Sequence, residues 1–138
     1  MKLDRTYSED EAQKASRRTL MQPGWRDAEN RDAVERKSEK SGRDVIDMRT
    51  VVPDDEGNER ELRTPLNNSP LGAALLRHCA EACGSLSKYE QGELLPQDLL
   101  GPVQVKIGIR KDRGWPARNV IEDFRAAASS VVNLRSAG

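Results

Sequence analysis

Apolar and polar side chains alternate through residues 103–110, and this period of two constrains the fold more than any other feature of the chain. Four β-branched residues occupy every second position of the segment: Val103, Val105, Ile107 and Ile109. An extended segment of this kind buries one face and exposes the other, so a strand is expected up to about residue 110. The same alternation over 44–52 and 59–66 predicts two more strands, joined by the polar turn 53–58. The chain is therefore expected to be mainly β.

Two further segments would complete the sheet, and one of them has two interpretations. Residues 117–124 follow the turn 111–114 and predict a returning strand. Residues 25–37 have helix propensity, yet their only apolar stripe is Ala33 and Val34. The turn 40–43 that follows favours a hairpin whose first arm is 25–37. From the residues alone, both structures stay open.

A single helix is expected over 70–83, between the third and fourth strands. Ser69 can cap it, Pro70 suits its first position, and Gly84 can end it in a left-handed conformation. The expected buried face consists of side chains at helical spacing: Leu71, Leu75, Cys79, Ala82 and Cys83. Residues 84–101 are expected to form a loop with a short turn of helix near 96–100.

The length of 138 residues fits one domain, and the composition limits how much of the chain can pack. Because 36% of residues are apolar and 33% are charged, little apolar surface is available to offset the ordering entropy. We expect a flexible or helical arm over 1–21, a domain over 22–125 and a frayed tail over 126–138. No stretch approaches the roughly 20 apolar residues that span a bilayer, and no apolar signal core follows the amino terminus. A cytoplasmic protein without membrane contact is expected.

Charge is informative only through its distribution, because 23 basic residues balance 23 acidic ones. The densest basic stretch is 106–118, where Asp112 is the only acid and Trp115 stands among the cations. Cations that follow phosphates and aromatic faces on which bases stack are what a site for single-stranded nucleic acid requires. A solvated hairpin with a tryptophan in the core is the alternative interpretation.

Residues that could carry catalysis are few. His78, the only histidine, would offer with Cys79 and Cys83 at most three metal ligands from one helix. The carboxylates around the turn 53–58 could form a Mg²⁺-dependent nuclease site only if they converge in space: Asp54, Asp55, Glu56, Glu59 and Glu61. The sequence contains no phosphate-binding, dinucleotide or nucleophile-elbow signature. We expect a binding protein that is not an enzyme and uses no metal or cofactor.

Five strands with a helix between the third and fourth are the order of an OB-fold, a small five-stranded barrel. The segment 105–124 resembles the carboxy-terminal hairpin of a group of small bacteriophage proteins, long classed as a domain of unknown function. That hairpin has an alternating strand, a Lys-Asp-x-Gly turn, an aromatic residue and an Arg-Asn-x-Ile stretch that ends in an aromatic residue. Residues 23–25, 38–42 and 45–52 resemble the family's opening, its Lys-Ser-Gly turn and its second strand. The resemblance covers about residues 20–125.

The resemblance implies an OB-fold single-stranded DNA-binding protein of phage replication and recombination, which acts with an annealing recombinase in the host cytoplasm. It also makes 25–37 a strand. The expected DNA contacts combine the matching positions with neighbouring arginines: Trp25, Arg26, Arg49, Lys106, Arg110, Lys111, Arg113, Trp115 and Arg118. The alternative is an OB-fold interaction module that recruits or regulates a recombinase and has little DNA affinity, favoured by zero net charge and few aromatic residues. The highly charged first strand would also fit the edge of a homo-oligomer.

Overall fold

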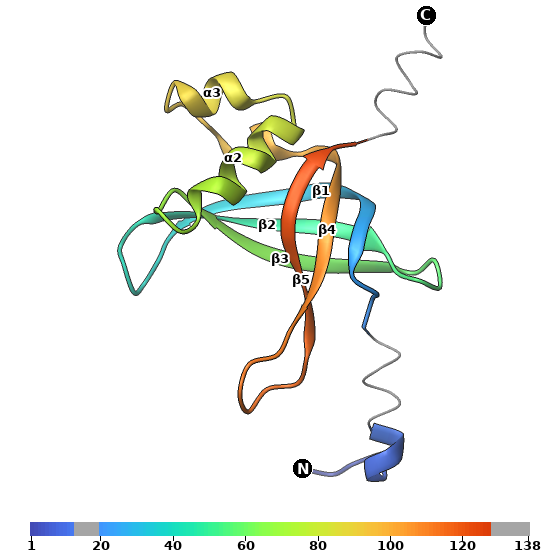
Figure 1. Ribbon diagram of the computed structural model, residues 1–138. Coiled ribbons are helices and arrows are strands. Elements are labelled where there is room, and N and C mark those ends of the chain that lie inside the picture. Colours follow the sequence, from blue (N-terminus) through green and yellow to red (C-terminus); the bar gives the residue numbers. More distant parts are fainter. Residues whose placement is uncertain (13–19, 128–138) are drawn as a thin grey trace, which may run out of the picture.

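The computed structural model of the chain describes residues 1–12 and 20–127. Five strands run antiparallel in the order β3-β2-β1-β4-β5 and curl into a half-barrel (Figure 1). Their bounds are β1 Gly24–Lys37, β2 Asp44–Pro53, β3 Glu59–Asn67, β4 Gly101–Arg110 and β5 Arg118–Ala126. The expected mainly β architecture with five strands is confirmed.

The sheet curls because β1 is long enough to pair with two different strands. Residues 24–30 of β1 pair with β4, and residues 29–37 pair with β2. The register shifts between Asn30 and Asp32, where an irregularity of the β-bulge kind bends the strand and increases its twist. Sheet pairing on both sides of this segment overrides the helix propensity of residues 25–37.

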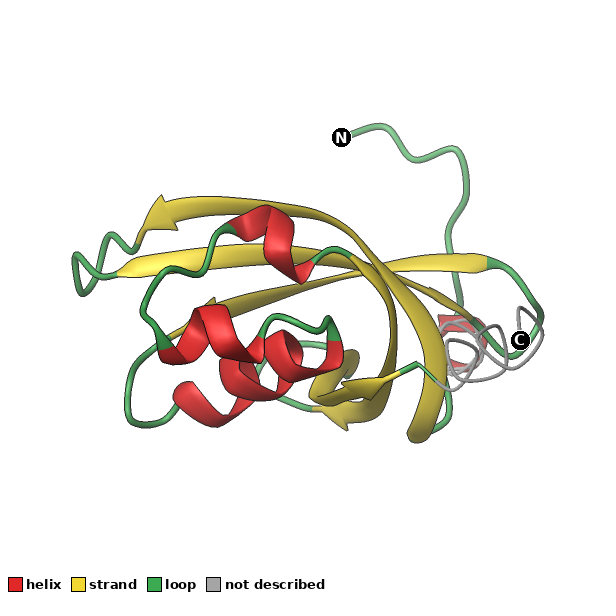
Figure 2. Cartoon of the chain, turned by 90° about the horizontal axis from the view of Figure 1, so that it is seen from above, coloured by secondary structure: helices red, strands yellow, loops and turns green. Residues whose placement is uncertain are grey.

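Three short helical elements between β3 and β4 lie against one side of the curled sheet (Figure 2). They are α2 (Ala73–Ala82), α3 (Leu86–Glu90) and the 3₁₀ turn η1 (Pro96–Leu99). The core is formed by the inner face of the sheet and the buried side chains of α2 and η1, including Met48, Val52, Leu66, Val105, Ile107, Phe124, Leu76, Cys79 and Leu99. Each large apolar side chain that is fully buried contributes about 1.5–3 kcal/mol.

Two expectations for the segment after β3 are wrong. The helix begins at Ala73, and Leu71 is 99% exposed instead of buried. Ser69 caps a turn ahead of the helix: its hydroxyl accepts the N–H of Gly72 at 3.0 Å and its carbonyl accepts the N–H of Ala73 at 2.8 Å. Pro70 and Leu71 are therefore residues of this turn, and the buried face of α2 starts at Leu76.

The expected loop over 84–101 contains α3 in addition to the expected short turn, which is η1. Gly84 adopts φ +74°, the left-handed conformation that ends α2 and lets the chain reverse. The hydroxyl of Ser85 then donates to the carbonyl of Asp98 at 2.7 Å and ties the start of α3 to η1. α3 has no buried residue, so no apolar stripe indicated it in the sequence.

The chain leading into β1 is fastened to β5. Met21 is 1% exposed, and its backbone N–H donates to Oδ1 of Asn119 at 2.7 Å while its carbonyl accepts from Nδ2 at 2.9 Å. Residues 9–12 form a helical turn. The tail expected to be frayed over 126–138 begins later than expected, because Ala126 is the last residue of β5 and Ala127 is 3% exposed. Its remainder from residue 128, and the rest of the helix expected in the arm over 13–19, lie outside the described residues.

The strands β3 and β5 are the two edges of the sheet. They approach each other, but the described strands form no hydrogen-bonded ladder across this seam. Pro65 lies within β3, opposite Asp47 of β2. Proline has no N–H to donate, so within a sheet it belongs to edge strands, as here.

Candidate nucleic-acid interface

The hairpin that joins β4 to β5 projects from the sheet and points away from α2 and α3 (Figure 1). Its end, which we call the hairpin tip, comprises residues 110–118, with Arg110 and Arg118 opposite each other as the last paired residues. The N–H of Trp115 donates to the carbonyl of Asp112 at 3.0 Å, and Gly114 between them adopts φ +83°. A compact turn therefore holds the side chains of the hairpin tip.

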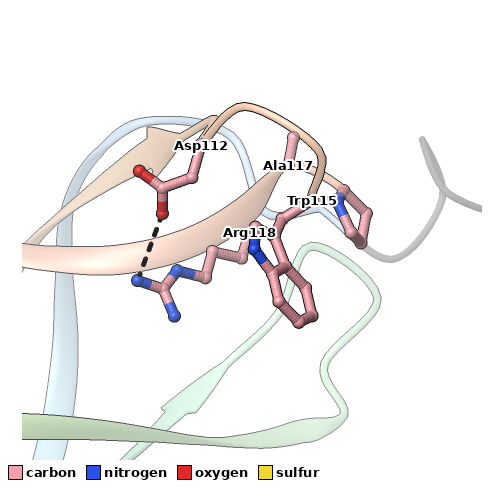
Figure 3. Close-up of a pocket in the computed structure, with 5 residues that line it drawn as sticks. Asp112, Trp115, Ala117 and Arg118 are labelled. Carbon is pink, nitrogen blue, oxygen red and sulfur yellow. Dashed lines mark ion pairs between the residues drawn. The ribbon is translucent and has the colours of Figure 1, made fainter.

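Trp115 lies in solvent at the hairpin tip, with 71% of its surface exposed. Its ring and the side chain of Arg118 project on the same side of the loop (Figure 3). Together with Asp112, Pro116 and Ala117 they line an open hollow of about 350 Å³. The interpretation that placed Trp115 in the core is wrong, and the ring is available for stacking.

Positive charge exceeds negative charge at the hairpin tip. Asp112 is shared by two arginines, with Oδ1 at 3.1 Å from Nε of Arg110 and Oδ2 at 3.7 Å from Nη2 of Arg118. Within the described ranges, Lys111 donates only to backbone carbonyls, those of Asp112 and Trp115. Arg113 has no ion pair with any described residue. Four cations against one carboxylate leave three positive charges without a local counterion.

Trp25 and Lys106 face each other across β1 and β4 on the outer face of the sheet. Trp25 is half-buried beneath the guanidinium of Arg125, whose Cζ lies 4.1 Å from the ring centroid. Lys106 is exposed and has no ion pair among the described residues. Arg125 was not among the expected contacts, although its place after the apolar Phe124 in a half-buried strand indicates the outer face.

Arg26 and Arg49, also expected to contact DNA, are occupied by partners within the protein. Arg26 forms an ion pair with Asp55 and donates to the carbonyl of Gln22 at 3.0 Å. The hydrogen bond from this guanidinium holds the pKa of the Asp55 carboxyl below its usual value. The guanidinium of Arg49 lies between two carboxylates, 3.9 Å from Asp32 and 3.6 Å from Glu61. Neither arginine lies at the hairpin tip.

Ion pairs neutralise most of the outer face of β1, β2 and β3. We call this surface the ion-pair face; its members are Asp32, Arg36, Asp47, Arg49, Glu61 and Arg63. Beside it, Arg31 makes two hydrogen bonds to Glu59 at 2.9 and 3.1 Å, which lower the pKa of that carboxyl. A phosphate approaching this surface would have to compete with carboxylates already in place.

The candidate metal ligands do not form a cluster in the described part of the chain. Nδ1 of His78 lies 2.7 Å from Oδ1 of Asp123, whereas Cys79 is buried in the core. A hydrogen bond to Cys83, together with burial, raises the pKa of the Cys79 thiol. The acidic residues around the turn 53–58 are directed to separate arginines: Asp54 to Arg60, Asp55 to Arg26 and Glu59 to Arg31.

Comparison with known protein families finds no family model that matches this chain, and comparison with curated proteins finds no match either. Among the described residues, no helix is long and apolar enough to cross a membrane. The assignment of a function therefore depends on the geometry and charge of the surfaces described above.

Proposed function

We propose that this protein is an OB-fold, sequence-nonspecific single-stranded DNA-binding protein that engages the strand through its hairpin tip. The observation that carries the proposal is the exposed ring of Trp115 in a loop with three uncompensated positive charges. Base stacking on an aromatic side chain contributes about 1–3 kcal/mol per base, and it tolerates every base because each has a π-face.

The arrangement of the strands supports the OB-fold part of the proposal. β1 pairs with β2 along one part of its length and with β4 along another. The helical elements follow β3 and precede β4. In OB-folds the loop between the fourth and fifth strands takes part in binding oligonucleotides. The corresponding loop here is the hairpin tip.

The proposed mechanism is electrostatic attachment with stacking, and no chemical step. Lys111, Arg113 and the two arginines that share Asp112 contact phosphates, while a base stacks on Trp115. Phosphate attraction and stacking act on every nucleotide alike, so no sequence preference is expected. From the sequence resemblance to the phage family, we further propose that this role belongs to replication and recombination in the host cytoplasm, beside an annealing recombinase.

The first test is a titration with a fluorescent oligothymidylate and with a matching duplex, each at low and at near-physiological salt. Thymine bases pair poorly with one another, so the titration isolates phosphate attraction and stacking. We expect the single strand to bind well above the duplex. Three neutralised phosphates give a slope of log affinity against log salt of about −2. Absence of binding to either molecule at low salt would refute the proposal.

Replacing the exposed ring tests the stacking part of the mechanism. Trp115→Ala is expected to weaken binding by about 5- to 150-fold, which corresponds to the loss of one stacked base. Because the ring lies outside the core, the free energy of unfolding in urea should stay within about 0.5 kcal/mol of the wild-type value. Leu71→Ala is the matched control, since it removes another exposed apolar side chain and should leave affinity unchanged.

A second candidate function is the interaction module that recruits or regulates a recombinase. It is favoured by a hollow of about 250 Å³ between the helices and β2–β3, whose floor is formed by the buried side chains of Ile46, Leu66 and Leu76 beside the exposed Asp44. A protein that fails to bind single strands at low salt but retains a purified annealing recombinase would favour this function.

A further inference from the structure

Arg125 is held in a fixed position on the outer face of the sheet, away from the hairpin tip. Its Cζ lies 4.1 Å from the centroid of the Trp25 ring, and its Nε donates to Oε1 of Gln104 at 2.7 Å. Nε2 of Gln104 donates in turn to Oδ1 of Asp27 at 2.9 Å. This chain of contacts orders the guanidinium before any ligand arrives.

The terminal nitrogens of Arg125 remain available to a ligand. Neither Nη1 nor Nη2 of this residue makes a hydrogen bond or ion pair with a described residue. An arginine guanidinium is planar and weakly hydrated, so it can stack against a base while its edge donates to a phosphate. Because ordering costs free energy on binding, a guanidinium already held by Trp25 and Gln104 binds at lower cost.

The space beside this guanidinium is open. A hollow of about 280 Å³ lies between α2 and β5, next to Trp25 and Arg125. His78 and Asp123 line it and are paired with each other at 2.7 Å, and the carboxylate of Glu81 also borders it. Because acidic side chains border this hollow, a neutral base fits it better than a phosphate does. The phosphate can instead contact the unpaired ammonium of Lys106, which lies opposite Trp25.

From these observations we propose that Arg125, supported by Trp25, is a second stacking platform for the same DNA strand. The strand crosses the outer face of β4 between this platform and the hairpin tip, and it avoids the ion-pair face. This inference rests on the proposed single-strand-binding function. It adds Arg125 to the DNA contacts and gives the direction in which the strand leaves the hairpin tip.

The register of β4 gives the distance that the strand must cover. Gln104, the partner of Arg125, and Arg110, the start of the hairpin tip, are six residues apart on one face. At about 3.4 Å per residue the two contacts are about 20 Å apart. About six nucleotides span this distance at the stacked spacing of 3.4 Å, and fewer when the strand is extended.

Carboxylates border the proposed path. Asp123 is the cross-strand partner of Lys106 and is paired with His78, and Glu122 lies nearer the hairpin tip. Gly108, midway between Lys106 and Arg110, has no side chain, and the side chain of Glu122 covers it so closely that an added Cβ would lie 2.0 Å from Oε1. A strand on this path meets the negative charge of Glu122. A strand on the ion-pair face would instead meet Glu61, which lies 3.6 Å from Arg49.

The first experiment compares two arginine variants on two oligothymidylates, one of about three nucleotides and one of about 15. Arg125→Ala and Arg63→Ala each remove one positive charge from the outer surface, but Arg63 belongs to the ion-pair face. We expect Arg125→Ala to weaken binding of the longer oligonucleotide at least fivefold. It should leave the shorter one, which can occupy the hairpin tip alone, within twofold. Arg63→Ala should change neither.

A second pair of variants tests the path itself. Glu122→Gln removes one carboxylate, the one without an ion-pair partner among the described residues, from the proposed path and should tighten binding of the longer oligonucleotide about two- to fivefold. Glu61→Gln makes the same chemical change on the ion-pair face and should have no effect. If Glu61→Gln tightens binding and Glu122→Gln does not, the strand crosses β2 and β3 and the proposal is wrong.

A spectroscopic measurement reports on the platform directly. The chain has two tryptophans, so Trp115→Phe leaves Trp25 as the only one while keeping an aromatic ring at the hairpin tip. Quenching of the remaining fluorescence by the longer oligonucleotide is expected, and Arg125→Ala should reduce it. If Trp115→Phe binds the longer oligonucleotide and the fluorescence of Trp25 is not quenched, the proposed stacking platform is refuted.

The outcomes separate the two proposals. If the wild type binds neither oligonucleotide at low salt, the proposed function fails and the platform fails with it. If Trp115→Ala weakens binding but Arg125→Ala behaves like Arg63→Ala, the hairpin tip binds DNA and only the platform is refuted. Thermal unfolding of each variant checks that the exposed substitutions leave the fold intact.

Discussion

At the scale of single residues, the buried amide of Asn30 joins three parts of the fold. Asn30 lies on β1 and is 1% exposed. Its Oδ1 accepts the hydroxyl of Thr50 on β2 at 2.7 Å, and its Nδ2 donates to the carbonyl of Leu99 in η1 at 2.9 Å. A buried polar group stabilises a protein only when its partners are present, because an unpaired one has lost water without compensation.

Thr50→Val tests this network. The substitution conserves shape but removes the hydroxyl, so Oδ1 of Asn30 stays buried without that donor. The free energy of unfolding in urea should fall by about 1–3 kcal/mol. Thr64→Val, on the neighbouring strand opposite Met48, makes the same change at a buried threonine whose hydroxyl has no partner among the described residues. Equal losses in both variants would mean that the bond to Asn30 contributes nothing.

At the scale of elements, the hairpin β4–β5 both presents the hairpin tip and fastens the amino-terminal segment. Asn119, one residue beyond the hairpin tip, holds both backbone groups of Met21 and also donates to the carbonyl of Gly108 at 3.3 Å. Asn119 belongs to the Arg-Asn-x-Ile stretch on which the sequence resemblance depends, and its side chain is used inside the protein. Its role is to connect the arm to the strand that carries the proposed DNA contacts.

Asn119→Ala should therefore loosen the chain before β1. The backbone groups of Met21 lose their partners, and a loss of about 1–3 kcal/mol in the free energy of unfolding is expected. Hydrogen exchange at the Met21 amide should accelerate by a larger factor than the loss of global stability accounts for. The amides of β2 should keep their protection. Unchanged exchange at Met21 would show that packing of its side chain alone holds this segment.

The elements differ in how far the sequence determines them. Alternation over 44–52, 59–66 and 103–110 predicts strands because burial of one face requires a period of two. α3 has no buried residue and gives no such signal. The platform of Trp25 and Arg125 was not predictable, because it depends on a register between segments 100 residues apart and on the shift between Lys106 and Ile107. The exposure of Trp115 was also not predictable, because it depends on the hairpin β4–β5 projecting beyond the sheet.

At the scale of the whole molecule, a net charge of zero conceals two different surfaces. Arginines of the ion-pair face meet carboxylates at short range, whereas the hairpin tip keeps an excess of positive charge. Total charge was therefore uninformative about function. In the proposed function, the separation of the two surfaces lets the hairpin tip attract a polyanion without the self-repulsion that a large net charge would impose.

Stability should fall in acid through three carboxyls whose pKa values lie below the usual range. Hydrogen bonds from Arg26, Arg31 and Lys88 lower the pKa values of Asp55, Glu59 and Asp98 respectively. Their contribution is fully present above the unfolded values of about 3.9–4.3, and it is lost as pH falls through the lower folded values. The temperature of thermal unfolding should be level from pH 7 to about pH 5 and should drop below it.

High salt provides the control for this expectation. Asp55 and Glu59 are exposed, so about 1 M salt screens their ion pairs and should flatten most of the acid limb of the profile. The side chain of Asp98 is only 9% exposed, so its ion pair is screened less. An equally steep loss at low and high salt would assign the acid sensitivity to groups other than these ion pairs.

The unclosed seam between β3 and β5 has a consequence for how the protein behaves when it is concentrated. A free strand edge can template the addition of another chain and so initiate aggregation. Along β3, charged side chains and Pro65 interrupt that template, since proline cannot supply the N–H that an incoming strand would need. Pro65 thereby removes one hydrogen-bond donor from the open edge, which disfavours the addition of another copy of the chain.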